Sequence, residues 1–461
     1  MKKVKSFVII LALCTLTACG RKEVDYSVDD SQDSSSGYSD ISMETISEKI
    51  GVEEQWEEVI DEGKLKKVYA DVVVPEVTGM KVVDVEPVDY PADPEAKEQF
   101  IRSITDGTIY YNYWKKEDYD WHIATVQEEL DYLEAEGGDD TYYDSRYEYL
   151  GYLEAERENA PESYIPAEDF KNNGYYLEYN EMLYTIEFIE YSNTDYKSIE
   201  FGLWDNADLV DMENINLYLY DVPMVEGDEN RCTMTAEEAK SEAQEFINSL
   251  NVGVFSCVDT MALKYSIYTN SNRYEVVMTD TTEQIEYLDG YTFRFVRSID
   301  GINVDGNYYL NGNIYSSQVI ETLDDTTINY GWAPESSMEE IFIRVNDKGI
   351  VAMTYHSPME ITGVNAENVK LLAFDEVKSS IAYVIDEKTY YEYTSFKYLE
   401  LTYFLYHDKE EDKHCIIPVW RLTDKTMDLI LRNNEKFSYV VINAMDGSVI
   451  NVGEQICRVF E

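Results

Sequence analysis

The chain has 461 residues, of which 92 are acidic and 37 are basic, so its formal net charge is −55 at pH 7. Binding to nucleic acid depends on lysine and arginine side chains that neutralise phosphates, so this composition argues against a nucleic-acid partner and against broad contact with an anionic membrane face. Hydrophobic residues make up 44% of the chain, which is enough to build cores over most of its length.

The first residues have the pattern of a secretory signal. Met1–Lys5 is basic, and Ser6–Ala18 is largely apolar but shorter than the about 20 residues that a membrane-spanning helix needs. Leu16-Thr17-Ala18-Cys19 resembles the lipobox of bacterial lipoproteins. The resemblance implies a cleaved signal peptide over residues 1–18, a diacylglycerol on Cys19, and a location on the outer face of the cell membrane.

Residues 19–45 are expected to form a flexible, acidic tether. Asp29–Asp40 consists of aspartate, serine, glutamine, glycine and one tyrosine, and such a segment cannot bury a core. A flexible segment of about 20 residues spans roughly 25 Å on average. The tether is therefore expected to hold the folded part of the chain away from the lipid.

A mixed region with a helical hairpin is predicted for residues 46–165. Apolar residues recur at helical spacing on both sides of a turn at Gly137–Asp140, and Pro161 follows the second helix. The positions that define the two helices are Ile123, Val126, Leu130 and Leu133, then Tyr147, Leu150 and Leu153. An earlier helix is expected to have Asp93 as its N-cap and Pro94 in its first turn.

Strands are predicted on both sides of this hairpin. Alternating and β-branched runs at Val68–Val77 and Lys81–Val88 precede it. A β-rich segment over residues 166–232 follows it, with strands expected at Leu183–Tyr191, Ile199–Trp204 and Ile215–Tyr220.

One helix followed by antiparallel strands is predicted to occur twice in the second half of the chain, over residues 233–356 and 357–461. Thr235–Glu238 is a capping box that opens the first helix, and Phe374–Ile385 has the apolar spacing of the second. The predicted strands are Met261–Tyr268, Arg273–Thr279, Tyr291–Arg297, Ile341–Val345 and Ile350–Tyr355, then Leu399–Leu405, Cys415–Leu422, Tyr439–Ala444 and Ser448–Asn451.

This repeated unit resembles the PepSY and PepSY-like domains of exported bacterial proteins. The resemblance is carried by Thr235–Ala239 at the helix start and by the closing hairpins Val345–Ile350 and Ile442–Val449. The whole chain is similar to uncharacterised lipoproteins of low-GC Gram-positive bacteria. The resemblance implies an α+β fold of tandem helix-on-antiparallel-sheet units after the mixed N-terminal region, no cofactor, and a role in binding, inhibition or regulation at the cell surface.

Cysteine and histidine spacing predicts no metal site. Two histidines, His407 and His414, lie near Cys415, but a zinc site needs three or four converging ligands. The chain contains no Gly-x-Ser-x-Gly, His-Glu-x-x-His or phosphate-loop motif. An exported protein can form disulfides. The pairings that would keep each bridge local in the sequence are Cys232 with Cys257 and Cys415 with Cys457.

These patterns favour a non-enzymatic binding or regulatory protein of the cell envelope, which reaches the membrane through the lipid on Cys19 and binds an envelope protein. The candidate contact surface consists of aromatic residues on predicted strands, each of which is more simply a core residue: Tyr291, Phe293, Trp420 and Tyr439.

Two alternatives are kept. The 41 tyrosines and the many acids suit a protein that binds or hydrolyses glycans, which requires a groove with exposed aromatic rings beside carboxylates. The resemblance to PepSY-containing propeptides suggests instead an inhibitor of a secreted protease.

Overall fold

The computed structural model describes residues 44–62, 66–136, 140–190, 197–203, 215–225, 227–269, 283–305, 339–387, 394–408, 413–423 and 439–450. Cys19, residues 20–43 of the predicted tether, Cys457 and the predicted strand Arg273–Thr279 lie outside the described residues. None of the helices within the described residues is long and apolar enough to cross a membrane.

Helices form where the sequence supplies caps and apolar spacing. They are α1 (Ile46–Ile50), α2 (Pro94–Ile104), α3 (Lys116–Glu136), α4 (Asp140–Asn159), α5 (Ala236–Ser249) and α6 (Phe374–Glu387). The Asp93 side chain accepts hydrogen bonds from the backbone N–H groups of Glu95 and Ala96 at the start of α2. The capping box at Thr235 opens α5 as predicted. The helical hairpin, α3 and α4, is also confirmed.

Strands make up most of the remaining ordered chain. The first group is β1 (Gln55–Asp61), β2 (Lys66–Val73), β3 (Val82–Pro87), β4 (Ile109–Tyr111), β5 (Gly174–Tyr179), β6 (Met182–Glu190), β7 (Lys197–Leu203) and β8 (Ile215–Pro223). The second is β9 (Phe255–Thr269), β10 (Glu283–Ile299), β11 (Ile302–Asp305), β12 (Glu340–Asn346), β13 (Gly349–His356), β14 (Met359–Ala366), β15 (Thr394–Asp408), β16 (Lys413–Thr423) and β17 (Tyr439–Asn443).

The prediction of tandem helix-on-sheet units is wrong, because the strands form one connected 17-stranded sheet with few helices. Strands from the N-terminal region pair with strands of the supposed C-terminal units. β2 runs parallel to β15, β3 lies between β14 and β16, and β7 pairs with β13. In tandem units, each strand would form its backbone hydrogen bonds with other strands of the same unit. In the structure, several strands form them with strands from distant parts of the chain.

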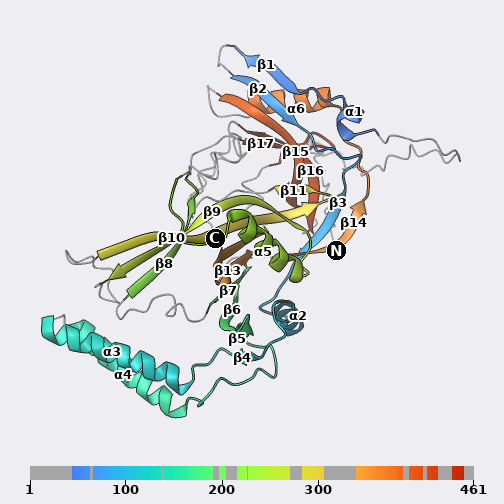
Figure 1. Cartoon of the computed structure of the whole chain (residues 1–461). Coiled ribbons are helices and arrows are strands. Elements are labelled where there is room, and N and C mark those ends of the chain that lie inside the picture. Colours follow the sequence, from blue (N-terminus) through green and yellow to red (C-terminus); the bar gives the residue numbers. More distant parts are fainter. Residues whose placement is uncertain are drawn as a thin grey trace, which may run out of the picture.

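Two apolar cores hold this sheet. One joins α2 and α5 to the antiparallel strands β4–β7, β9, β10, β12 and β13, with Phe100, Ile247 and Phe293 among its buried residues. The other joins α1 and α6 to β2, β3, β15, β16 and β17, with Ile381 and Trp420 inside it. β10 continues through Asp300-Gly301 into β11, which pairs with β15 and so links the two parts (Figure 1).

The α3–α4 hairpin is an insertion between two neighbouring strands. The chain leaves β4, forms both helices, and returns as β5, which pairs antiparallel with β4. The hairpin therefore extends from the end of the sheet as an arm (Figure 1). The same route brings the returning segment, residues 160–173, back beside β4.

Candidate binding site

A groove of about 830 Å³ lies where the end of α2, strand β4 and the β5–β6 turn meet, beside the base of the arm. Its lining includes three tyrosines, Tyr110, Tyr164 and Tyr179, and three carboxylates, Asp106, Glu178 and Glu181. We call it the tyrosine groove. Pockets with aromatic walls and a few polar groups are the usual form of small-molecule sites.

The floor of the groove forms where α2 ends close to β5. The Thr105 hydroxyl donates to the backbone oxygen of Glu178 and accepts from the Gly107 N–H at 2.9 Å. A Cβ atom at Gly107 would lie 2.6 Å from the same Glu178 oxygen. Only glycine therefore fits at this close approach of two backbone segments.

The Glu178 carboxylate is held in place by β4. The Tyr110 hydroxyl donates to Glu178 Oε1 at 2.7 Å, and the Thr108 N–H donates to Oε2 at 3.4 Å. The hydrogen bond to this carboxylate raises the pKa of Tyr110 above its usual value. These two hydrogen bonds fix the position of the carboxylate. Glu178 is exposed, so the carboxylate is also accessible from the groove.

The opposite wall is formed by Tyr164, which lies on the segment returning from the arm. Its ring centroid is 5.8 Å from that of Tyr110, and its hydroxyl donates to Asp118 Oδ1 at 3.2 Å. The ammonium group of Lys115 lies 5.0 Å from the Tyr164 ring centroid, within the range of a cation–π contact. Tyr164 is thus tied to the start of α3 on one side and faces Tyr110 on the other.

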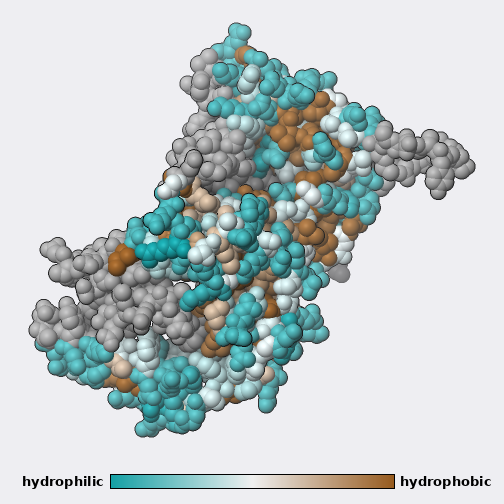
Figure 2. All heavy atoms as spheres, in the orientation of Figure 1, coloured by the Kyte–Doolittle hydropathy of each residue, from teal (hydrophilic) through white to brown (hydrophobic). Residues whose placement is uncertain are grey.

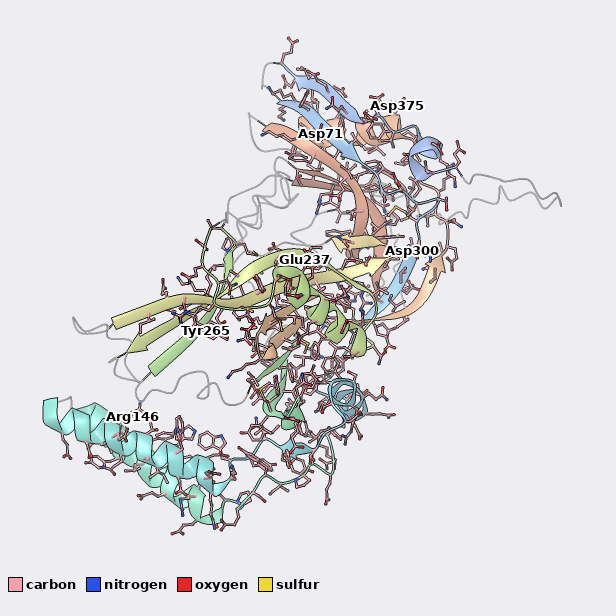
Figure 3. The ribbon with its side chains drawn as sticks, in the orientation of Figure 1. Asp71, Arg146, Glu237, Tyr265, Asp300 and Asp375 are labelled. Carbon is pink, nitrogen blue, oxygen red and sulfur yellow. The ribbon has the colours of Figure 1, made fainter. Side chains whose placement is uncertain are left out.

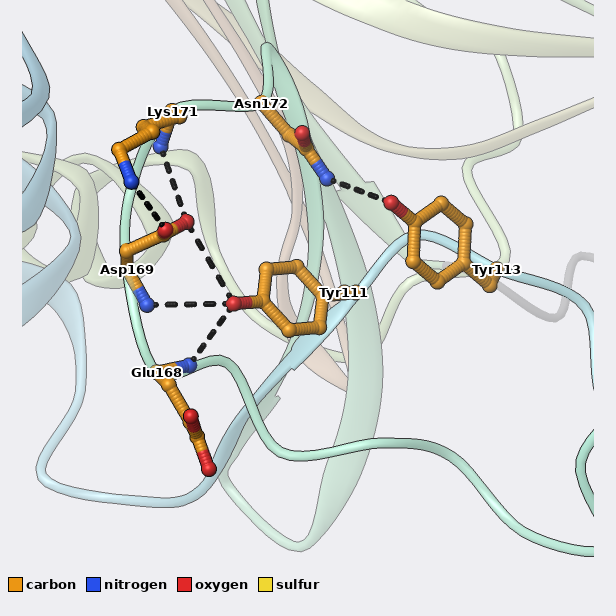
Figure 4. A network of polar contacts seen from close by, with 6 residues as sticks. All are labelled: Tyr111, Tyr113, Glu168, Asp169, Lys171 and Asn172. Atoms are coloured by element: carbon orange, nitrogen blue, oxygen red, sulfur yellow. Dashed lines mark hydrogen bonds and ion pairs between the residues drawn. The ribbon is translucent and has the colours of Figure 1, made fainter.

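A hydrogen-bonded network fixes this returning segment against β4 (Figure 4). The Tyr111 hydroxyl oxygen accepts from the backbone N–H groups of Glu168 at 3.1 Å and Asp169 at 3.2 Å. The Asn172 side-chain amide donates to the Tyr113 hydroxyl at 3.1 Å. Because the segment is held along β4, Tyr164 stays opposite Tyr110.

The rim of the groove contains a strained turn. Asn180 and Glu181, between β5 and β6, have φ angles of 50° and 64°. Two successive residues with positive φ are characteristic of a two-residue type I′ hairpin turn. Asparagine tolerates this conformation, but glutamate is uncommon there. Such strain is often found at functional sites, and here it places Glu181 at the groove.

Replacing Glu181 by glycine is expected to raise the free energy of unfolding by about 1 kcal/mol, because the left-handed conformation costs an L-residue about 1–2 kcal/mol. Denaturant unfolding of the full chain measures the change. The matched control is Glu187→Gly within β6, which is expected to lower stability by about 0.5–1 kcal/mol. A loss of stability in Glu181→Gly would show that the turn is not strained.

Three of the four aromatic residues of the predicted contact surface are buried. Tyr291, Phe293 and Trp420 are only 8%, 0% and 0% exposed. Tyr291 and Phe293 lie in the core beneath α5, whereas Trp420 lies in the core beneath α6. Tyr439, in β17, pairs through its backbone with Thr423 of β16. The first three side chains are core residues and are unavailable to a ligand.

The cysteines and histidines take ordinary structural positions. Cys232 and Cys257 are free thiols that donate to Asp347 and to the Asp259 backbone oxygen, so the bridge between them is absent. His407 and His414 face each other across β15 and β16, with ring centroids 4.2 Å apart. No group of three or more potential metal ligands comes together within the described part of the chain.

Sequence patterns did not identify the tyrosine groove. Its residues come from four separate segments, and no motif links Tyr110 to Tyr164 or Glu178. The one local signal was Tyr179-Asn180-Glu181-Met182 between two alternating runs, which is compatible with a tight hairpin turn. The tyrosines near residues 110 and 175 resembled ordinary strand residues.

Comparisons with known proteins give little further information. No protein-family model matches the chain, and a search of curated proteins found no match. Among solved structures, the chain is similar to an uncharacterised protein from Eubacterium rectale, with a TM-score of 0.38 and 13% sequence identity. The similarity covers 87% of this chain and 94% of that protein.

Proposed function

We propose that this chain is a non-enzymatic lipoprotein of the cell envelope that binds a glycan in the tyrosine groove. The observation that carries the proposal is the groove itself, in which tyrosine rings stand beside a positioned carboxylate. Sugars offer C–H faces that pack on aromatic rings and hydroxyls that donate to carboxylates, and the groove provides both kinds of contact.

The proposed location follows from the lipobox. A diacylglycerol on Cys19 would hold the protein durably at the membrane, because two acyl chains anchor a protein where one does not. The predicted tether would allow the groove to reach glycans a short distance from the lipid surface. The high negative charge favours neutral or cationic glycans over polyanionic ones.

Glycan binding is tested by an array screen with the full chain, followed by calorimetric titration of the glycan that binds. Glu178→Gln keeps the side-chain shape but removes the charge, and is expected to weaken the affinity at least tenfold, since a hydrogen bond to a charged group contributes about 1.5–3 kcal/mol. Tyr164→Ala is expected to weaken it by a similar factor through loss of one wall.

The matched control is Tyr69→Ala, which removes a tyrosine that is 52% exposed on β2, far from the groove (Figure 1). Its affinity is expected to equal that of the unmodified chain. Absence of any glycan hit would refute the proposal. Release of shorter sugars during incubation would show instead that the protein hydrolyses glycans.

A further inference from the structure

The α3–α4 arm has a small core of its own. Val126, Leu130, Leu150 and Leu153 form an apolar cluster that is separate from the two cores of the sheet. The two helices contact each other along their length while the arm extends away from the sheet (Figure 1). Much of its surface is therefore available for contacts with another molecule.

Large aromatic side chains are exposed on this arm. Trp121 is 49% exposed, Tyr147 is 46% exposed and Tyr152 is 57% exposed. The rings are also held by neighbours. Tyr152 stacks on Tyr149 with ring centroids 6.3 Å apart, and Trp121 contacts His122 edge to face with ring centroids 4.7 Å apart. Tryptophan and tyrosine are enriched in the energetic centres of protein interfaces, and rings that are already oriented lose little freedom on binding.

The arm is also strongly acidic. α3 and α4 together contain 14 acidic and 3 basic side chains, and hydrophilic residues cover most of the arm (Figure 2). The basic side chains are already engaged: Arg157 pairs with Asp120 and Lys116 pairs with Glu162, while Arg146 on the outer half of α4 also has a partner (Figure 3). The carboxylates therefore greatly outnumber the cations available to neutralise them.

We infer that the arm docks a lysine- and arginine-rich segment of another protein. Exposed rings attract ammonium and guanidinium groups through cation–π contacts, and the surrounding carboxylates provide charge complementarity. An acidic partner would be repelled by the same surface. The exposed rings of the arm, Trp121, Tyr147 and Tyr152, do not line the tyrosine groove.

The probe is a synthetic peptide rich in lysine and arginine, titrated against the full chain by fluorescence anisotropy at two salt concentrations. A peptide with glutamine at the basic positions is the negative probe. Binding is expected to weaken at higher salt because the contacts are largely ionic. The double variant Trp121→Ala/Tyr152→Ala is expected to bind about tenfold more weakly, since each exposed cation–π contact contributes about 0.5–1 kcal/mol.

Two controls separate loss of the rings from loss of the fold. Tyr69→Ala, which removes an exposed tyrosine from β2, is expected to bind the peptide as the unmodified chain does. Trp121→Phe/Tyr152→Phe retains aromatic faces and is expected to recover most of the affinity. Circular dichroism checks that the helices persist in each variant.

Two results would overturn the inference. Equal affinity in the alanine variant and the unmodified chain would mean that the peptide binds as it would to any polyanion, without the rings. Tighter binding of chitosan oligomers than of the peptide, lost in the same alanine variant, would assign the arm to a cationic glycan rather than to a protein. Glu178→Gln is expected to leave peptide binding unchanged, so failure here is distinct from failure of the glycan proposal.

Discussion

Replacing Arg297 by methionine is expected to lower the free energy of unfolding by about 3–5 kcal/mol, because it leaves a buried charge without its partner. Arg297 forms a two-pronged ion pair with Glu339, and its Nη2 lies 2.6 Å from Glu339 Oε1. The two side chains are 3% and 6% exposed. Water therefore cannot replace the lost guanidinium.

Other hydrogen bonds join this pair to several elements. Arg297 Nη2 also donates to the backbone oxygens of Val252 and Met359 at 3.0 and 2.9 Å. Glu339 Oε1 accepts from the Tyr355 hydroxyl at 2.6 Å and from the Met359 N–H at 2.9 Å. The network thus connects the loop after α5 with β10, β13 and the start of β14.

Arg297 remains protonated in the folded protein. Burial by itself would lower the pKa of Arg297, but attraction to the Glu339 carboxylate outweighs burial and raises it. Burial, reinforced by the charge of Glu339, also raises the pKa of Tyr355 well above its ordinary value, so its hydroxyl stays a proton donor. The loss in Arg297→Met is therefore expected to be similar across neutral pH.

Urea unfolding of the full chain measures the Arg297 effect. The matched control is Arg157→Met, which makes the same substitution in an exposed ion pair with Asp120. It is expected to change the free energy of unfolding far less. Changing both partners, Arg297→Met with Glu339→Leu, is expected to restore part of the loss, because no isolated charge remains. A loss as small as that of Arg157→Met would show that the network does not stabilise the fold.

Signals that act within a few residues predicted the local elements well. The capping box at Thr235, the N-cap at Asp93 and the apolar spacing of α3 and α4 each determine a helix through neighbours in the sequence. The polypeptide needs no distant partner to satisfy these hydrogen bonds. Such elements appear in the structure close to the predicted positions.

Strand partners could not be predicted in this way. β2 and β15 are more than 300 residues apart, yet Phe396 lies beside Val68 in parallel register. Alternating apolar residues show that a strand is half-buried, but they do not specify which strand it pairs with. The tandem-unit interpretation assumed that neighbouring strands pair within each unit, and the long-range pairs of β2, β3 and β7 contradict it.

The same limit explains why the tyrosine groove was missed. Tyr110 and Tyr164 come together only because the arm is inserted between β4 and β5 and its returning segment is fixed by Tyr111. An aromatic residue on a strand has the same sequence pattern whether it faces the core or a ligand. Phe293 and Trp420 face the core, and Tyr110 faces the groove.

Replacing Trp420 by alanine is expected to lower the free energy of unfolding by about 3–5 kcal/mol, the usual cost of removing a large buried aromatic side chain. Trp420 is fully buried in β16 and packs against Phe374 of α6 with ring centroids 5.6 Å apart. Its removal would leave a cavity beneath α6 that the surrounding strands cannot close.

The indole N–H gives this prediction a finer test. Trp420 Nε1 is buried and has no hydrogen-bond partner among the described residues, so the native residue already bears the cost of an unsatisfied donor. Trp420→Phe removes this donor and keeps most of the apolar volume, and it is therefore expected to cost far less than Trp420→Ala. Denaturant unfolding compares the two variants, and glycan titration of Trp420→Phe is expected to give the unmodified affinity. If a stably folded Trp420→Phe variant lost glycan binding, Trp420 would be part of the contact surface after all, contrary to its burial.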